Sequence, residues 1–454
     1  MERVNSNRTI REKLSSGSSL LGIGAAMVFF AGTVAVSPAY AQAQGARIQQ
    51  SEQILQPSGE VDEHDQFGSA VALSGKTMVI GAETSDGRVA GAGAAFIFDK
   101  VDNHWVQTAK LFADDGNAFP AAGRPGEFTS DSFGLTVAIS EDGNTVIVGA
   151  PNHNHGTTFP GGDQGSVYVF QRVNGVWSQQ TELLSPNPNR SDNFGNASDS
   201  GGLAISGGTI VVTDQGNFIT GAPAAVDVFT RTNGVWLLAT QLFVPGDPAF
   251  LPSSVAFDGH TLAVGSDFSN NSSGAVYVFR VNQGQWSAPV TLAASDATPG
   301  ALFGFNVSLS GNLIAVGAAS GPGATAQSGA AYVFANEEGV WSQKAKLSAS
   351  DGLDGDDFGS FISISGHTVL VGAFDHTPPA TGIFFAGAAY VFQLGDGVWQ
   401  QIAVLTASDG ISAGTFGFGG VAVQNNTLLV GASGQHPPVE GYAGGEAYVY
   451  NLNP

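Results

Sequence analysis

The chain of 454 residues contains no cysteine and few charged side chains. Without cysteine it has no disulfide framework, so its stability must come from packing and closure. Charged residues make up 12% of the chain, about half the roughly 25% of ordinary proteins, and 16 bases face 38 acids. The net charge of −22 disfavours nucleic acid as a partner, because phosphate binding depends on clustered Lys and Arg. With 43% apolar residues, the composition also argues against disorder.

Glycine, in contrast, is abundant, with 63 residues in the chain. This is about twice the roughly 7% of ordinary proteins, but there is no G-X-Y period, which excludes collagen. Many turns combined with few charges predict an all-β protein built from short strands.

The first 41 residues have the pattern of an export signal. Four bases between residues 3 and 13 precede an uncharged run from Ser19 to Val36, and an A-x-A pattern follows at 39–41. A transmembrane anchor is the alternative, since about 18 apolar residues nearly span a bilayer. The glycines of the run, Pro38 and the small residues at its end favour cleavage. We therefore predict a signal peptide over 1–41 and a mature protein over 42–454, without a membrane span, in the periplasm, on the cell surface or outside the cell.

One pattern recurs seven times along the mature chain. Each copy begins with an apolar–small–apolar–polar stretch, which is followed by a short turn, three apolar residues and a Gly. The spacing from Gly81 in the first copy to Gly431 in the last gives a mean period of about 58 residues. A β-branched and aromatic run such as Ala389–Phe392 follows, and then a segment from a Trp to a Leu six residues later, as in Trp341 to Leu347. Each unit therefore predicts four strands, and all six Trp are expected to be core or blade-packing residues.

Four antiparallel strands repeated radially predict an all-β fold, a seven-bladed β-propeller in a single domain. The last unit lacks its Trp-to-Leu strand, and residues 46–56 supply one, with Ile48 at the Trp position and Ile54 at the Leu position. We predict that this N-terminal strand completes the last blade and removes an exposed sheet edge. The expected blade cores are about 65–111, 131–183, 192–242, 250–292, 301–347, 356–405 and 415–450, the last together with 46–56.

A Phe-Gly pair begins most units, and a Gly-Ala pair follows about 14–16 residues later. The first units show this as Asp65-Gln66-Phe67-Gly68 with Gly81-Ala82, and Asp131-Ser132-Phe133-Gly134 with Gly149-Ala150-Pro151. Over roughly residues 47–450 the chain resembles the FG-GAP repeat of integrin α-subunit head propellers and their bacterial relatives. Blades three and four are degenerate, with Leu251-Pro252 where blade four should have Phe-Gly.

In the integrin-type repeat, an acidic loop of the form D-x-[DN]-x-D-G-x-x-D between strands one and two holds calcium. The longest equivalent loop here, Ser140–Asn144, offers only two carboxylates, whereas calcium takes six to eight oxygens. The family's calcium sites are therefore not expected, and the chain looks like a short-loop bacterial variant.

Loops 2–3 and 4–1 of each blade leave the fold on the same face and are long, which is typical of functional loops. By the resemblance, this face meets ligand and partner subunit in integrins. The basic residues predicted on this face are only Arg88, Arg124 and Arg190, and they are outnumbered by its acids. The acids are Asp86, Asp114, Asp115, Asp131, Asp163, Asp192, Asp296, Asp351, Asp354, Asp356, Asp357, Asp375 and Asp409. The candidate ligand-binding residues are Asp114, Asp115, Asp351, Asp354, Asp356, Asp357 and Asp409.

In the densest acidic stretch, Asp351, Asp354 and Asp356 are candidate calcium ligands, but Asp before Gly is also an ordinary turn device, so no metal site is predicted there. No other cofactor is predicted. Four histidines lie in the long loops, but a metal site needs three or four convergent ligands and these lie on different loops. They are His153, His155, His376 and His436.

These observations predict a non-enzymatic recognition or adhesion module, monomeric, that binds a protein or a cell-surface polysaccharide through its acidic face. One alternative is a carbohydrate-active enzyme that uses carboxylates of the same face. Another is a purely structural envelope protein. Substitution of Asp354 and Asp356 would lower binding in the first case, turnover in the second, and neither in the third.

Overall fold

The computed structural model describes residues 48–55, 65–88, 91–116, 131–153, 164–186, 193–195, 201–216, 221–434 and 444–452. The chain divides into two units, Met1–Ala43 and Gln44–Pro454, and every described residue belongs to the second. The predicted signal peptide lies outside the described residues. Within the described ranges, no helix has the length and apolar character needed to cross a membrane.

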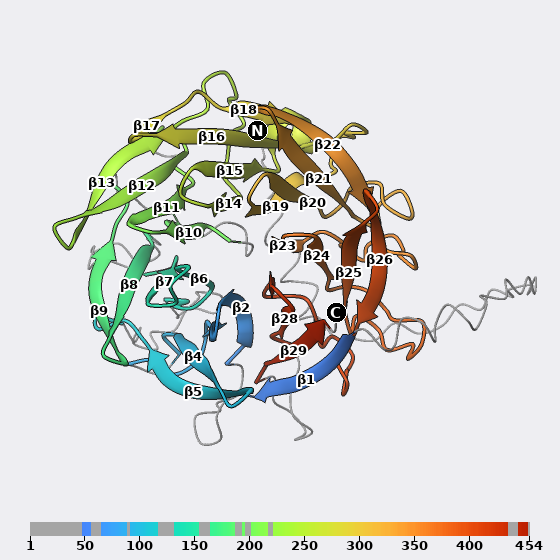
Figure 1. The fold of residues 1–454 in the computed structure, drawn as a ribbon, viewed down its shortest axis with the longest axis horizontal. Coiled ribbons are helices and arrows are strands. Elements are labelled where there is room, and N and C mark those ends of the chain that lie inside the picture. The colour runs from blue at the N-terminus through green and yellow to red at the C-terminus, as the bar shows by residue number, and fades with distance from the viewer. Residues whose placement is uncertain are drawn as a thin grey trace, which may run out of the picture. The chain divides into compact units, whose positions relative to one another are not determined.

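Seven antiparallel sheets follow one another around a common axis, which confirms the predicted seven-bladed β-propeller (Figure 1). Chain order within the first three blades is also the order from the axis outward. Blade one consists of β2 (Phe67–Ser74), β3 (Thr77–Ala82), β4 (Ala94–Val101) and β5 (His104–Leu111). Blade two consists of β6 (Thr136–Ile139), β7 (Thr145–Ala150), β8 (Ser166–Val173) and β9 (Val176–Leu183). Blade three consists of β10 (Leu203–Ser206), β11 (Thr209–Asp214), β12 (Ala225–Thr232) and β13 (Val235–Leu242).

The later blades repeat this plan, with a split fourth strand in blade four and a short helical segment, α3 (Ser269–Ser272), in its 2–3 loop. Blades four and five hold β14 (Ser254–Phe257), β15 (Thr261–Ser266), β16 (Ala275–Asn282), β17 (Gln285–Trp286) and β18 (Val290–Leu292); β19 (Phe303–Ser310), β20 (Leu313–Ala318), β21 (Ala330–Glu337) and β22 (Val340–Leu347). Blades six and seven hold β23 (Phe361–Ser365), β24 (Thr368–Ala373), β25 (Ala388–Gly395) and β26 (Val398–Leu405); β27 (Val421–Gln424), β28 (Thr427–Ala432), β29 (Glu446–Leu452) and β1 (Ile48–Leu55).

Blade seven is closed by the N-terminal strand, as predicted. In the pairing of β1 with β29, Ile48 lies opposite Leu452 and Ile54 opposite Ala447. This is the register that Trp399 and Leu405 take against β25 in blade six. The two ends of the described chain therefore lie side by side in one sheet, and the last blade keeps no unpaired outer edge on β29 (Figure 1).

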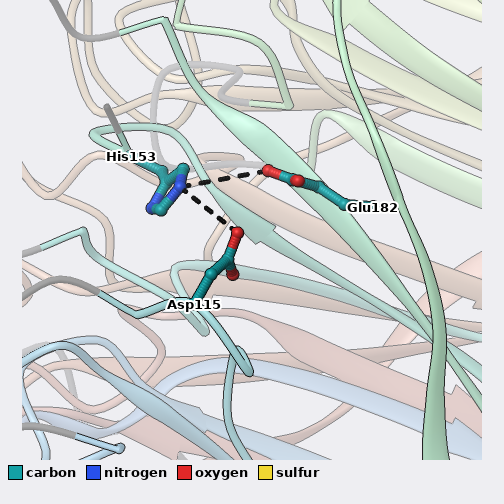
Figure 2. Close-up of side chains that lie close together, drawn as sticks. All are labelled: Asp115, His153 and Glu182. Atoms are coloured by element: carbon teal, nitrogen blue, oxygen red, sulfur yellow. Dashed lines mark ion pairs between the residues drawn. The ribbon is translucent and has the colours of Figure 1, made fainter. Parts of the chain in front are cut away.

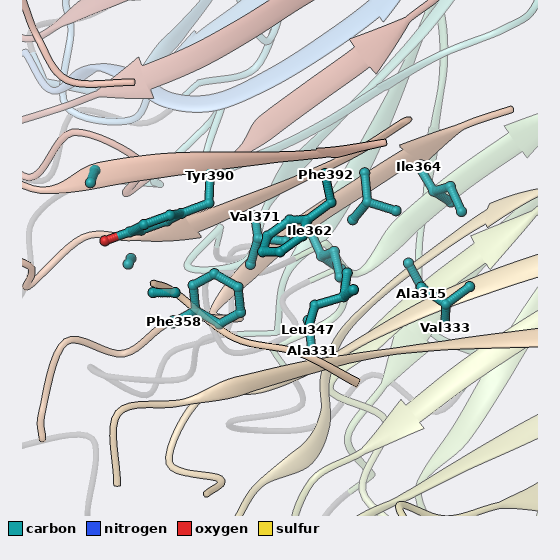
Figure 3. Close-up of a cluster of buried hydrophobic side chains, with 14 residues drawn as sticks. Ala315, Ala331, Val333, Leu347, Phe358, Ile362, Ile364, Val371, Tyr390 and Phe392 are labelled. Atoms are coloured by element: carbon teal, nitrogen blue, oxygen red, sulfur yellow. The ribbon is translucent and has the colours of Figure 1, made fainter. Parts of the chain in front are cut away.

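The Phe-Gly pair forms the contact between blades. Phe358 is fully buried and meets Tyr390 and Phe392 edge to face, with ring centroids 5.3 and 6.0 Å away (Figure 3). The cluster around it joins strands of blades five and six, and full burial of such a ring is worth about 1.5–3 kcal/mol. Gly359 has φ +98°, and a Cβ there would lie 2.4 Å from the carbonyl oxygen of Ala330 in the preceding blade. Only glycine fits this approach.

The innermost strands line an axial cavity of about 280 Å³, to which all seven blades contribute residues. Serines on one inner strand accept backbone N–H groups of the next, as Ser308 does from Ile364 at 3.1 Å and Ser363 from Val423 at 3.0 Å. The small residues of the first strand therefore serve two purposes, since they fit the crowded axis and bond adjacent blades. The six Trp all pack in or against the apolar clusters between blades, as predicted.

Candidate functional site

In the described parts of the chain, the 2–3 and 4–1 loops leave the blades on one face, which we call the long-loop face. A 4–1 loop bonds to the 2–3 loop of the blade before it through main-chain groups. The Gly355 N–H donates to the Gln327 carbonyl oxygen at 3.0 Å, and the Ala413 N–H donates to the Phe384 carbonyl oxygen at 3.0 Å. The tight 1–2 turns lie instead beside the 3–4 hairpins, where Arg172 donates to the Gly143 carbonyl at 2.8 Å. The long-loop face thus has a scaffold of backbone hydrogen bonds.

A tyrosine on the third strand holds an aspartate of the 4–1 loop in four blades. Each phenol donates to its carboxylate, and burial raises the pKa of the phenol in every case. The pairs are Tyr277 to Asp247 at 2.5 Å, Tyr332 to Asp296 at 2.8 Å, Tyr390 to Asp351 at 2.8 Å and Tyr448 to Asp409 at 2.7 Å. Two candidate ligand-binding residues, Asp351 and Asp409, therefore accept bonds from the propeller itself.

The other five candidates lie on two loops, the one before blade two and the one before blade six. Asp354, which is exposed, accepts the Thr325 hydroxyl at 2.6 Å and the Gln327 N–H at 2.9 Å, so it ties two loops of the face together. Asp114 and Asp115 are exposed before blade two, and Asp357 is half-buried before blade six. The candidates do not form one cluster, and in the acidic stretch before blade six Asp354 has its own partners, Thr325 and Gln327.

In blade six, two candidates converge on a histidine. His376 is fully buried; its Nδ1 lies 2.8 Å from Asp356 Oδ2, and its Nε2 lies 3.6 Å from Asp351 Oδ2. Burial disfavours the charged ring, but the two carboxylates outweigh it and raise the pKa of His376 to about 9. The same ring lowers the pKa of Asp351. Asp356 also accepts the Leu353 N–H at 2.7 Å, so this group locks the turn between blades five and six.

Blade two carries a related group at the equivalent positions. His153 is buried, and its Nδ1 lies 3.1 Å from Asp131 Oδ2. Its Nε2 lies 3.8 Å from Asp115 Oδ2 and 3.9 Å from Glu182 Oε1 (Figure 2). Burial works against the charge of this ring, yet the nearby carboxylates, Asp131 first, raise the pKa of His153.

Glu182 is the residue that sequence reasoning missed. It lies on β9 opposite Tyr168, whereas Val404 lies opposite Tyr390 in blade six. The repeat did carry a signal for the other two members of the group, because blades two and six both have G-A-x-x-H starting at the end of the second strand and an Asp-Gly turn before the first strand. Within the described ranges, Asp115, His153 and Glu182 are the one group of three or more metal-ligating side chains close enough to share an ion.

Two exposed aromatic residues lie on the long-loop face of blade six. Phe384 is 69% exposed and Phe385 is 50% exposed, in the 2–3 loop. Phe385 has φ +52°, a left-handed conformation that is rare for an aromatic residue and is found at ligand-contacting sites. The loop is tied to the adjacent 4–1 loop, because Ser412 and Ala413 both donate to the Phe384 carbonyl oxygen, at 3.2 and 3.0 Å.

Comparison with protein families gives one match. The sequence profile described as the FG-GAP repeat matches residues 51–98, 126–170, 286–334, 341–392 and 399–450, more than half of the chain. The unmatched stretch between the second and third segments contains most of blades three and four, whose repeats are degenerate. No curated protein sequence matches the chain.

Proposed function

Because the chain belongs to the FG-GAP repeat family, we propose that it is an exported, non-enzymatic recognition module that binds a protein or a surface polymer through its long-loop face. The observation that carries this proposal is the pair of exposed aromatic residues, Phe384 and Phe385, on a loop that the neighbouring loop fixes. Aromatic side chains presented on a rigid support lose little entropy on binding and dominate the affinity of many interfaces.

Exposed carboxylates on the same face favour a basic or hydroxyl-rich ligand. Asp354 and Asp409 are both exposed on the long-loop face, on the 4–1 loops before and after blade six. Exposed carboxylates accept hydrogen bonds from hydroxyl and ammonium groups, and they raise the local concentration of cations. Phe384 and Phe385 would then supply apolar contact, with the carboxylates at the rim.

The proposal is tested with the full chain on an array of glycans and envelope proteins. We expect the double variant Phe384→Ser, Phe385→Asn to lose at least tenfold in affinity for any ligand found, because asparagine tolerates the left-handed backbone while the aromatic contact is removed. Val340→Ser is the matched control: Val340 is 68% exposed, but it begins the fourth strand at the opposite face.

Binding that is unchanged in the double variant, or that falls equally in the control, would contradict the proposal. Turnover of an arrayed glycan would favour the carbohydrate-active enzyme instead. Export is tested separately: N-terminal sequencing of the protein recovered outside the cytoplasm should begin at residue 42 if the signal is cleaved after Ala41.

A further inference from the structure

Three ligand atoms of blade two converge from three separate segments. Asp115 comes from the loop after β5 and His153 from the loop after β7, and Glu182 is the penultimate residue of β9. Their nearest nitrogen and oxygen atoms all lie within 4.8 Å of one another (Figure 2). A shared approach by one imidazole and two carboxylates, far apart in sequence, is a donor set that transition metals use.

The distances suit a small ion. Around a tetrahedral ion with bonds of about 2.0–2.2 Å, neighbouring ligand atoms lie about 3.3–3.6 Å apart. The His153 nitrogen lies 3.8 and 3.9 Å from the two carboxylate oxygens, so the group needs to contract by only a few tenths of an ångström on that side. The side chain of Asp115 is 49% exposed, so the ion can reach the group from solvent, while the side chain of His153 is 3% exposed and is held in place by burial.

The residues behind the ligands orient them as metal sites require. Asp131, 1% exposed, lies 3.1 Å from His153 Nδ1, which directs Nε2 toward the other two carboxylates. This carboxylate–histidine arrangement fixes the tautomer and the ring orientation of metal-bound histidines. Ser166, fully buried, donates to Glu182 Oε1 at 2.7 Å and holds that side chain as well.

Blade six provides an internal comparison. Its His376, Asp356 and Asp351 repeat His153, Asp131 and Asp115, but Val404 stands where blade two has Glu182. Blade six therefore has the oriented histidine and one facing carboxylate without the third ligand. The buried histidine and its supporting aspartate are part of the fold in both blades, whereas the third ligand is particular to blade two.

We propose that Asp115, His153 and Glu182 bind one divalent first-row transition metal ion, with Zn²⁺ as the best fit and a fourth position left for water or for a ligand donor. The mixed nitrogen and oxygen donors suit zinc. Calcium does not suit the site, because it takes six to eight oxygens. The site lies on the long-loop face, remote from the 1–2 turns.

The test is a titration of the chelator-treated full chain with ZnCl₂ by isothermal titration calorimetry. We expect a micromolar or tighter site of unit stoichiometry that Ca²⁺ does not occupy. Glu182→Val copies blade six and should weaken that site at least 100-fold. The converse variant, Val404→Glu, should add a second site, and His376→Gln should leave the first unchanged.

Circular dichroism of each variant shows whether the propeller is retained. If Glu182→Val does not fold, Glu182→Gln, which keeps the shape and the Ser166 hydrogen bond, replaces it in the titration. A second readout is the visible absorption of bound Co²⁺, which reports its ligands directly. The proposal is overturned if the wild-type chain shows no such zinc site, or if the Glu182 variant binds zinc as tightly as the wild type.

Discussion

A rise in pH should destabilise the propeller through His376. The ring is fully buried, with its Nδ1 2.8 Å from Asp356 and its Nε2 3.6 Å from Asp351. Burial opposes protonation, but the two carboxylates raise the pKa of His376 to about 9, from 6.5 in the unfolded chain. Because the folded pKa is the higher one, the histidine stabilises the fold fully below pH 6.5, and this stabilisation is lost as the pH rises through 9.

The size of the effect follows from the two pKa values. One unit of pKa is worth about 1.4 kcal/mol, so the shift from 6.5 to about 9 corresponds to about 3 kcal/mol of unfolding free energy. Tyr390 faces the same group, but burial raises the pKa of its phenol, so it stays protonated throughout this range. The contribution of this group to the change between pH 6 and 9.5 therefore comes from the histidine and its two carboxylates.

The assay is urea unfolding of the wild type and of His376→Gln at pH 6.0 and at pH 9.5. Glutamine keeps a donor near Asp356 but does not titrate, and every other group cancels in the comparison. The substitution should lower the free energy of unfolding more at pH 6.0 than at pH 9.5. The difference between the two losses should be about 3 kcal/mol. A pH dependence that is the same in both proteins, within about 0.5 kcal/mol, would refute the reasoning.

Two further predictions concern the closure of the ring and the contact between blades. Ile54→Ala should lower the free energy of unfolding by about 3 kcal/mol in urea melts, because Ile54 is 6% exposed in the strand that completes blade seven. The neighbouring Leu55, 49% exposed, is the control and should lose less than about 0.5 kcal/mol as alanine. Gly359→Ala should cost more than about 2 kcal/mol, since its Cβ would lie 2.4 Å from the Ala330 carbonyl oxygen. Gly339→Ala shares the positive φ but has open space around it and should cost less.

Equal losses for Ile54→Ala and Leu55→Ala would mean that β1 does not contribute to the closed ring. Equal melting temperatures for the two glycine variants would show that the close approach between blades five and six is readily relieved, so that backbone strain alone accounts for the effect.

The sequence was sufficient for the architecture because the relevant signals are local and repeated. The Trp-to-Leu spacing, the hairpin turns and the Phe-Gly pairs recur in each unit, so a weak signal in one blade is reinforced by the next. The register of Ile48 and Ile54 in blade seven could be predicted for the same reason, since each takes the place of a known strand position.

The candidate site was less predictable, because its contacts join residues that are distant along the chain. Asp351 and Asp409 were predicted as ligand-binding residues of an acidic face, and their binding role stays a prediction. That Tyr390 and Tyr448, each 39 residues further on, donate to them could not be read from either segment alone. The strand pattern of the sequence predicts that many acids lie in the long loops, but it does not tell which carboxylates can contact a ligand and which hold the loops.

By itself, then, the sequence determined seven four-stranded blades and their closure by the N-terminal strand, because strand periodicity and turn chemistry act over a few residues. Only the tertiary structure decided that Glu182 approaches His153 in blade two while Val404 takes its place in blade six, and that Phe384 and Phe385 stand exposed. The physical reason is that a binding site depends on distances of a few ångströms between loops of one or more blades. Those distances are set by blade packing, which no local pattern encodes.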